Sequence, residues 1–240
     1  MLGRWIGKFI LATLVFVSLV GAAAAQSRIA LVIGNSAYRN AQALPTAHGD
    51  AAVVAETMRA AGYEVIELRD LHLDDIGPAM RDFLDKVAAA GPQGVAFVYF
   101  SGYAAQSQGQ NYLVPVDAQI GRDSDVPLQA LRLSDLIQEM MSLPAAARLV
   151  VLDGARDHGF GRGTAQAVPR GLAVMDVPEG MLIASSAAPG ALAVDGDASY
   201  SIYTGALVTA MRQPGLDMEQ IFKAARLQVN QATGAARRPG

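Results

Sequence analysis

The sequence is poor in reactive side chains: its 240 residues include no cysteine, three histidines and one tryptophan. Without cysteine the chain forms no disulfide, carries no thiol nucleophile and offers no thiolate to a metal. The missing thiol also excludes a lipoprotein, because lipid attachment at a signal site needs a cysteine. Its fold and chemistry must therefore rest on other side chains.

Charge is also scarce, since only 17% of the residues are charged and the formal net charge is -3. No long basic run and no basic-aromatic cluster is present, which excludes nucleic acid as a partner. A hydrophobic content of 52% in a chain of this length is ample for one domain with a large buried core.

The N-terminal segment has the order of a secretory signal. Arg4 and Lys8 precede an uncharged apolar run, and small residues then lead to Ala25. We predict a signal peptide over residues 1–25 and a single domain over 26–240. An uncleaved anchor is the alternative, because the stretch 9–25 only reaches the lower limit for spanning a bilayer. Cleavage is favoured, so we expect a periplasmic or secreted protein without a stable membrane anchor.

Apolar runs and helical periodicity alternate along the rest of the chain. Strands are predicted at 28–34, 63–68, 94–101, 148–153 and 181–185, and helices at 50–61, 74–89, 131–141, 200–211 and 217–233. This alternation predicts an α/β fold in which a mainly parallel central sheet is flanked by helices.

Ligands of such sheets bind beyond the carboxyl ends of the strands. The turns 101–104 and 153–156 and the pair Ser185–Ser186 should meet there. We expect residues 111–116 to be a short extended piece at the surface, because Pro115 cannot serve a central ladder. The Gly-rich loop 159–171, which carries Arg162 and Arg170, should be polar and mobile.

Six segments, in order, resemble the blocks of bacterial caspase-like cysteine peptidases of the metacaspase and orthocaspase type. They are 28–38, 49–51, 99–104, 111–117, 151–156 and 193–196. The resemblance spans about residues 28–233 and implies a caspase-like three-layer sandwich. Relatives commonly continue into a further strand or accessory region near this point, and the sequence leaves open whether such a part belongs to the protein.

The resemblance places the family's catalytic base at Tyr103 and its cysteine nucleophile at Ala155. Cysteine peptidases need a thiolate beside an imidazole that titrates near neutrality. Alanine has only a methyl group, and tyrosine, with a reference pKa near 10, is a poor base at neutral pH. Loss of a triad nucleophile costs on the order of a million-fold in turnover. We therefore expect a pseudoenzyme.

The resemblance also implies a binding cleft that does not depend on the missing groups. The family's oxyanion donors would be the backbone N–H groups of Ala104 and Ala155. Asp50 and Asp153 match aspartates of the family's basic-residue pocket and could hold an Arg or Lys guest. Two other roles remain open: Asp50 as a helix N-cap, and Asp153 as a partner of Arg156 in a turn.

Other chemistry has weaker support in the sequence. A relocated serine–histidine pair would need His158 beside one of four serines: Ser101, Ser107, Ser185 and Ser186. No Gly-x-Ser-x-Gly elbow supports such a pair, and we expect the turn serines to bond local backbone and His158 to be solvated. We predict no metal site and no cofactor: His48 and His72 should be surface residues, and the acidic cluster at 70–75 should be a solvated helix cap rather than a calcium site.

The sequence thus predicts an exported, inactive caspase-like protein that binds a peptide or protein, with an Arg or Lys side chain in a vestigial acidic cleft. Edge strands could pair two copies, or pair the chain with an active relative. The enzymatic alternative is an endopeptidase that cleaves after Arg or Lys with a non-standard nucleophile, and the missing cysteine argues against it. A third alternative is a structural domain with an unused cleft.

Overall fold

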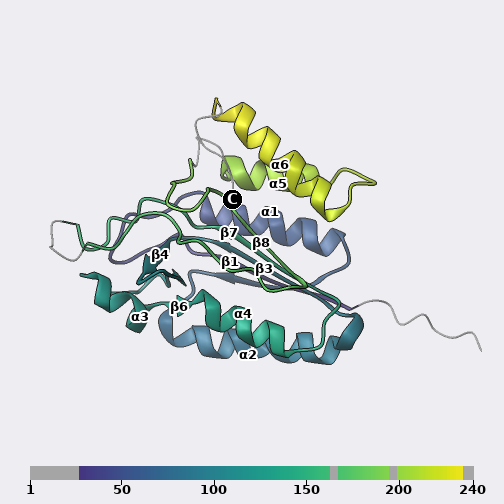
Figure 1. Ribbon diagram of the computed structural model, residues 1–240, viewed down its shortest axis with the longest axis horizontal. Helices are drawn as coiled ribbons and strands as arrows, with labels where there is room; N and C mark the ends of the chain where they lie inside the picture. Colours follow the sequence, from purple (N-terminus) through teal and green to yellow (C-terminus); the bar gives the residue numbers. More distant parts are fainter. Residues whose placement is uncertain (1–26, 163–166, 195–198, 235–240) are drawn as a thin grey trace, which may run out of the picture.

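The computed structural model describes residues 27–162, 167–194 and 199–234, and these form three layers (Figure 1). The central layer is a parallel sheet with the strand order β2-β1-β3-β7-β8. Its strands are β1 (Arg28–Gly34), β2 (Glu64–Arg69), β3 (Val95–Ser101), β7 (Ala147–Asp153) and β8 (Met181–Ser185). The α/β fold with a parallel central sheet, predicted from the sequence, is confirmed.

Helices cover both faces of this sheet, as Figure 1 shows: α1, α5 and α6 lie on one side, and α2 and α4 on the other. Their bounds are α1 (Ala47–Ala60), α2 (Leu73–Ala90), α4 (Leu133–Ser142), α5 (Ile202–Met211) and α6 (Met218–Ala232). Each lies within a few residues of its predicted range. The shorter pieces are α3 (Val126–Gln129) and two 3₁₀ turns (Gly91–Gln93 and Asp123–Asp125).

The central strands are apolar throughout because both of their faces are covered. Side chains alternate along a strand, so Val98 and Phe100 of β3 pack with α2 and α4, whereas Phe97 and Tyr99 pack with α1 and α5. All of these side chains are buried. Two separate hydrophobic cores therefore hold the helical layers to one sheet.

A second, antiparallel sheet follows β3 and consists of β4 (Ala104–Ser107), β5 (Gln110–Leu113) and β6 (Leu131–Arg132), in that order. The prediction that residues 111–116 lie at the surface is wrong, since all six are buried. Pro115 follows the end of β5, so it interrupts no ladder bond. The interior of this chain includes a small sheet that the apolar pattern alone did not reveal.

The expectation of a polar, mobile loop at 159–171 is also corrected in part. Phe160 and Val168 are buried and pack into a third hydrophobic cluster, together with Tyr38 and Tyr103. Arg162 and Arg170 are exposed and both face Asp157. Residues 163–166 lie outside the described part. The loop thus contributes apolar side chains to the interior.

The register of the sheet brings the predicted turns to one edge. Ser101 at the end of β3 is paired with Asp153 at the end of β7, and Leu152 is paired with Ser185. Within the three described ranges no helix is long and apolar enough to cross a membrane. The predicted signal peptide lies outside those ranges.

Candidate functional site

The candidate site lies at the carboxyl edge of the central sheet, where β3 leads to Tyr103 and β7 leads to Ala155. Both side chains are buried, with exposures of 2% and 0%. Asn35, just after β1, donates its N–H to the Ser101 carbonyl, and the N–H of Gly102 donates to the Asp153 carbonyl. These bonds hold the ends of three strands together and fix the two turns in space.

Tyr103 is a packed core residue. Its ring lies 4.7 Å from that of Tyr38 and 5.7 Å from that of Phe160, edge to face with the latter, and its hydroxyl donates to the Gln42 carbonyl at 3.1 Å. Tyr38 accepts the Tyr103 N–H at 2.7 Å and donates to the Val114 carbonyl. The position where the sequence resemblance predicts a general base therefore holds an aromatic ring whose hydroxyl is already bonded.

His158 is buried, contrary to the expectation that it is solvated, with an exposure of 5%. Its ring stacks on Phe160 at 4.8 Å, and Nδ1 accepts the Phe160 N–H, so the proton resides on Nε2, which faces the Pro169 carbonyl at 3.3 Å. Burial lowers its pKa, so the neutral form prevails at neutral pH. Both ring nitrogens are used locally.

The four candidate serines have local partners or none among the described residues. Ser101 donates to Asp50, Ser107 to the Asp123 carbonyl and Ser185 to the Ala187 carbonyl. The Ser186 hydroxyl is buried without a hydrogen-bond partner in the described ranges. No hydrogen bond joins any of these hydroxyls to His158 in that part of the chain, so the described residues form no relocated serine–histidine pair.

Asp50 and Asp153 come together, and Arg156 of the same chain lies between them. Its Nη2 is 3.4 Å from Oδ2 of Asp50 and 3.3 Å from Oδ1 of Asp153. Both carboxylates are 0% exposed and Arg156 is 3% exposed. We call these three residues the buried ion triad. The chain's own guanidinium occupies the acid pair.

Asp50 is not a helix cap, contrary to one of the predicted roles. Helix α1 begins at Ala47, with Thr46 at the N-cap, so Asp50 lies inside the first turn. The helix starts three residues earlier than its apolar periodicity indicates, because Ala47 and His48 carry little amphipathic signal. The carboxylate therefore faces the sheet edge instead of the helix's own N–H groups.

Hydroxyl and amide donors complete the coordination of the acid pair. Asp50 accepts the Ser101 hydroxyl at 2.7 Å and the Ser201 N–H at 2.6 Å, while Asp153 accepts the hydroxyls of Ser201 and Thr204. Ser201 is also the N-cap of α5 and accepts the Thr204 N–H. Ser201 and Thr204 were not predicted as part of the site, although a serine just before an apolar helix is a recognisable cap signal.

One guanidinium faces two carboxylates in this buried place. Burial raises the pKa of Asp50 to about 7, and the like charge of Asp153 adds to the rise, while the Ser201 N–H and Arg156 oppose it. Desolvation is the larger cause because the carboxylate lies away from water. The triad thus contains a buried carboxyl group, that of Asp50, whose pKa lies near neutrality.

The predicted oxyanion donors are only partly available. The Ala104 N–H donates to the Gly154 carbonyl at 2.9 Å, so in this conformation it is bonded within the chain. A Cβ at Gly154 would lie 2.8 Å from the Ala104 Cβ, which shows how closely these two turns approach. The geometry stabilises the turns and leaves no thiol, free imidazole or paired donors for acyl transfer among the described residues.

The histidines outside the site lie where they were predicted, half-buried near the ends of elements. His48 pairs with Asp70 at 2.9 Å and His72 with Asp117 at 3.4 Å. Asp70 also accepts the N–H groups of Ser36 and Ala37. The structure shows no group of three or more metal-ligating side chains among the residues that it describes.

Comparison with known proteins agrees with this architecture. A family profile described as the caspase domain matches residues 27–240. Among solved structures, the Drosophila initiator caspase Dronc superposes with a TM-score of 0.62 at 10% sequence identity, covering 89% of this chain and 78% of that one. At this identity the match shows the fold alone. A search of curated proteins finds no match.

Proposed function

Because this chain belongs to the caspase-domain family, we propose that it is a caspase-fold pseudo-peptidase, exported from the cytoplasm, which binds a peptide or protein segment without cleaving it. The observation that carries this proposal is Ala155, a fully buried methyl group at the position of the family's nucleophile. The whole sequence contains no thiol.

The base position supports the same conclusion. Tyr103 is held among Tyr38, Phe160 and the Gln42 carbonyl. A phenol that is already bonded and buried accepts no proton from a nucleophile at neutral pH. Both halves of the catalytic pair are thus replaced by packing.

Recognition of a basic residue at the acid pair would require an exchange. Arg156 occupies the place between Asp50 and Asp153, so a guest Arg or Lys side chain binds there only when Arg156 leaves. The triad lies beside the start of α5, which Ser201 ties to both carboxylates. We propose that binding at this site moves Arg156 and the first turn of α5 together.

We propose that a partner chain pairs with the edge strand of the central sheet. Strand β8 is paired with β7 on one side only in the described sheet. An exposed strand edge can add a strand from a second copy or from an active relative. The proposed location is periplasmic or secreted, based on residues 1–25.

A binding experiment tests the acid-pair part of the proposal. Two capped pentapeptides, Ala-Ala-Arg-Ala-Ala and its all-alanine counterpart, are titrated into the protein by calorimetry. We expect the arginine peptide to bind more tightly, and Asp50→Asn to reduce that preference because one of the two carboxylates is neutralised.

Asp85→Asn is the matched control, since Asp85 is exposed on α2 and the charge change is the same. Equal affinities for the two peptides would contradict binding of a basic residue at the triad. Cleavage of the arginine peptide would contradict the proposal as a whole.

A further inference from the structure

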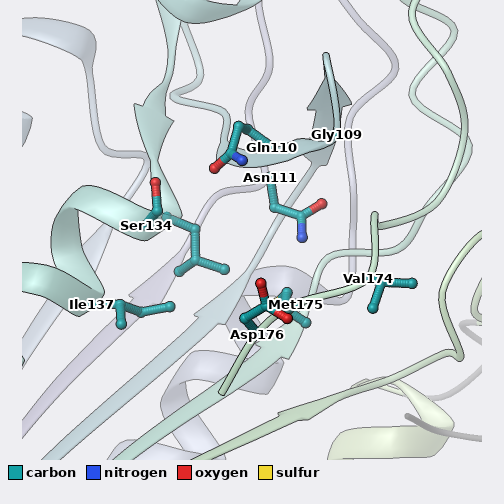
Figure 2. Close-up of a pocket in the computed structure, with 9 residues that line it drawn as sticks. Gly109, Gln110, Asn111, Ser134, Ile137, Val174, Met175 and Asp176 are labelled. Carbon is teal, nitrogen blue, oxygen red and sulfur yellow. The ribbon is translucent and has the colours of Figure 1, made fainter. Parts of the chain in front are cut away.

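A second concave site lies at the tip of the β4–β5 hairpin, away from Tyr103. It is a pocket of about 290 Å³ between β5, the start of α4 and the segment 174–176. Figure 2 shows side chains from these three segments around one open space, with Gln110 and Asn111 on one side, Ser134 and Ile137 on the second, and Val174 to Asp176 on the third. We call it the hairpin pocket.

The strand register explains why a pocket exists here. Strand β6 pairs with β5 only at Leu131↔Leu113 and Arg132↔Tyr112. The next two residues of the chain, Leu133 and Ser134, would continue this ladder opposite Asn111 and Gln110, but helix α4 begins at Leu133. The chain leaves the sheet at this point and opens a space beside the first half of β5.

Asn111 fixes the far wall of the hairpin pocket. Its side-chain amide donates to the Ala173 carbonyl at 3.0 Å and accepts the Ala173 N–H at 2.8 Å. This pair of bonds holds the following residues, Val174 to Asp176, against the hairpin. The wall formed by this segment is therefore anchored to β5 through Ala173.

The lining of the hairpin pocket has one charge. Asp176 is the only ionisable residue that lines it, and it is exposed and has no ion-pair or hydrogen-bond partner in the described part of the chain. The neutral polar side chains are those of Gln110, Asn111 and Ser134. Asn111 is bonded to Ala173, and the other two have no side-chain hydrogen bond within that part. The remaining lining side chains, which are those of Leu133, Ile137, Val174 and Met175, are apolar.

The volume and the lining side chains of the hairpin pocket together indicate what kind of group it binds. Sites for drug-sized ligands start at about 300 Å³, so this volume fits one long side chain. An aliphatic stem ending in a cation matches apolar walls with a single carboxylate. Val174, which lines the pocket and is 76% exposed, gives an apolar surface for a residue next to that side chain.

We propose that the hairpin pocket binds a lysine or arginine side chain of an extended segment of a partner protein, with Asp176 as its counter-ion. The hydroxyl of Ser134 and the amide of Gln110 bond the main chain of that segment. Like the site in the proposed function, the hairpin pocket would bind a peptide. It lies on a different face of the domain from the buried ion triad.

The test is a titration of the ¹⁵N-labelled protein with four capped pentapeptides of the form Thr-Val-X-Val-Thr, in which X is lysine, arginine, norleucine or glutamate. Because an exposed ion pair contributes little, we expect lysine and arginine to bind about two- to five-fold more tightly than norleucine, and glutamate to bind most weakly. Amide shifts should cluster at Gln110, Asn111, Ser134 and Val174. The preference should shrink as salt rises.

Variants at the counter-ion make the test decisive. Asp176→Asn should bind the lysine and norleucine peptides equally, and Asp176→Lys should prefer the glutamate peptide, while Asp85→Asn should behave as the wild type. Both positions are exposed, so folding is retained.

The proposal is overturned if no peptide binds at millimolar concentration, or if the lysine and norleucine peptides bind with equal affinity. It is also overturned if Asp176→Asn leaves the preference for the lysine peptide unchanged, or if the protein self-associates and Asp176→Lys abolishes that self-association. Shifts confined to Ser201 and Asp153 would also overturn it. That last result would support peptide binding at the triad, so the two proposals fail separately.

Discussion

Arg156 is the residue that most changes the interpretation of the site. A carboxylate pair at strand ends indicates a pocket for a basic guest, but the guanidinium three residues after Asp153 fills that place. Its Nη1 also donates to the Gly102 and Asp153 carbonyls. Arg156 thus ties the turns after β3 and β7 to α1.

Removal of the guanidinium should destabilise the fold strongly. Arg156→Met leaves two buried carboxylates without their cation, and loss of one partner of a buried ion pair costs about 3–5 kcal/mol. Urea unfolding measures the change. Arg59→Met, at an exposed ion pair, should cost less than about 1 kcal/mol.

The triple variant Arg156→Met, Asp50→Asn, Asp153→Asn checks this mechanism. Because it removes the uncompensated charges as well, it should regain much of the lost free energy of unfolding. A triple variant as unstable as Arg156→Met would contradict the electrostatic explanation and point to lost packing.

The raised pKa of Asp50 predicts a pH dependence of stability. The pKa rises from 3.8 to about 7 on folding, so between these values the native state binds more protons than the unfolded state. The free energy of unfolding should therefore fall as pH rises through this window, by at most about 1.4 kcal/mol per pH unit. Asp50→Asn should show a flatter profile in urea unfolding across the same window, and identical slopes would contradict the assignment.

At the scale of elements, the β4–β5 hairpin links the turn at Tyr103 to the hairpin pocket. It starts directly after Tyr103, and its second strand ends before Val114, whose N–H donates to the Tyr103 carbonyl. The segment after Gly171 crosses this hairpin, where Leu172 is buried and Asn111 bonds Ala173.

Asn111→Ala should release this segment. It removes both bonds to Ala173, at a cost of about 1–3 kcal/mol, and the amides of residues 172–176 should exchange with deuterium faster than in the wild type. Gln110→Ala is the neighbouring control, because that side chain is exposed. Unchanged exchange at 172–176 in Asn111→Ala would show that other contacts hold the segment.

The central strands were predictable because they are long apolar runs, buried on both faces, and each carries its own signal. The small sheet was not: β6 has only two residues, and Pro115 argued for the surface although it stands just outside the ladder. Strand register brings Asp50, Asp153 and the turns together, and the sequence predicted this meeting. The sequence offered the pairing of Arg156 with Asp153 as one alternative, and the structure shows it. It did not predict that the same guanidinium also reaches Asp50, because that depends on where one flexible side chain packs.

His158 shows the same limit. The glycines and charged residues around His158 predict a solvated side chain. In the structure the loop folds back, so that Phe160 stacks on His158 and Tyr103 lies beside the two rings. Burial of this loop is a long-range effect of an aromatic residue at position 103. No local pattern carries that information.

At the scale of the whole molecule, the chain has the three layers of the caspase domain, and Tyr103 and Ala155 are packed in its interior. Ala155 is fully buried, and its carbonyl accepts the Ala193 N–H. At the same sheet edge, Asp50 is bound by Arg156 and Ser201. We propose that this domain binds a peptide and does not cleave it.

Peptide hydrolysis tests that claim most directly. The purified protein is incubated, from about pH 5 to pH 9, with a fluorogenic peptide library that carries every residue type before the reporter group. A Ser186→Ala variant is assayed in parallel. It removes the one candidate serine hydroxyl that has no hydrogen-bond partner in the described ranges. We expect neither form to release the reporter group faster than heat-denatured protein does. Saturable release by the wild type after arginine or lysine, lost in Ser186→Ala, would contradict this expectation and establish a peptidase with a relocated nucleophile.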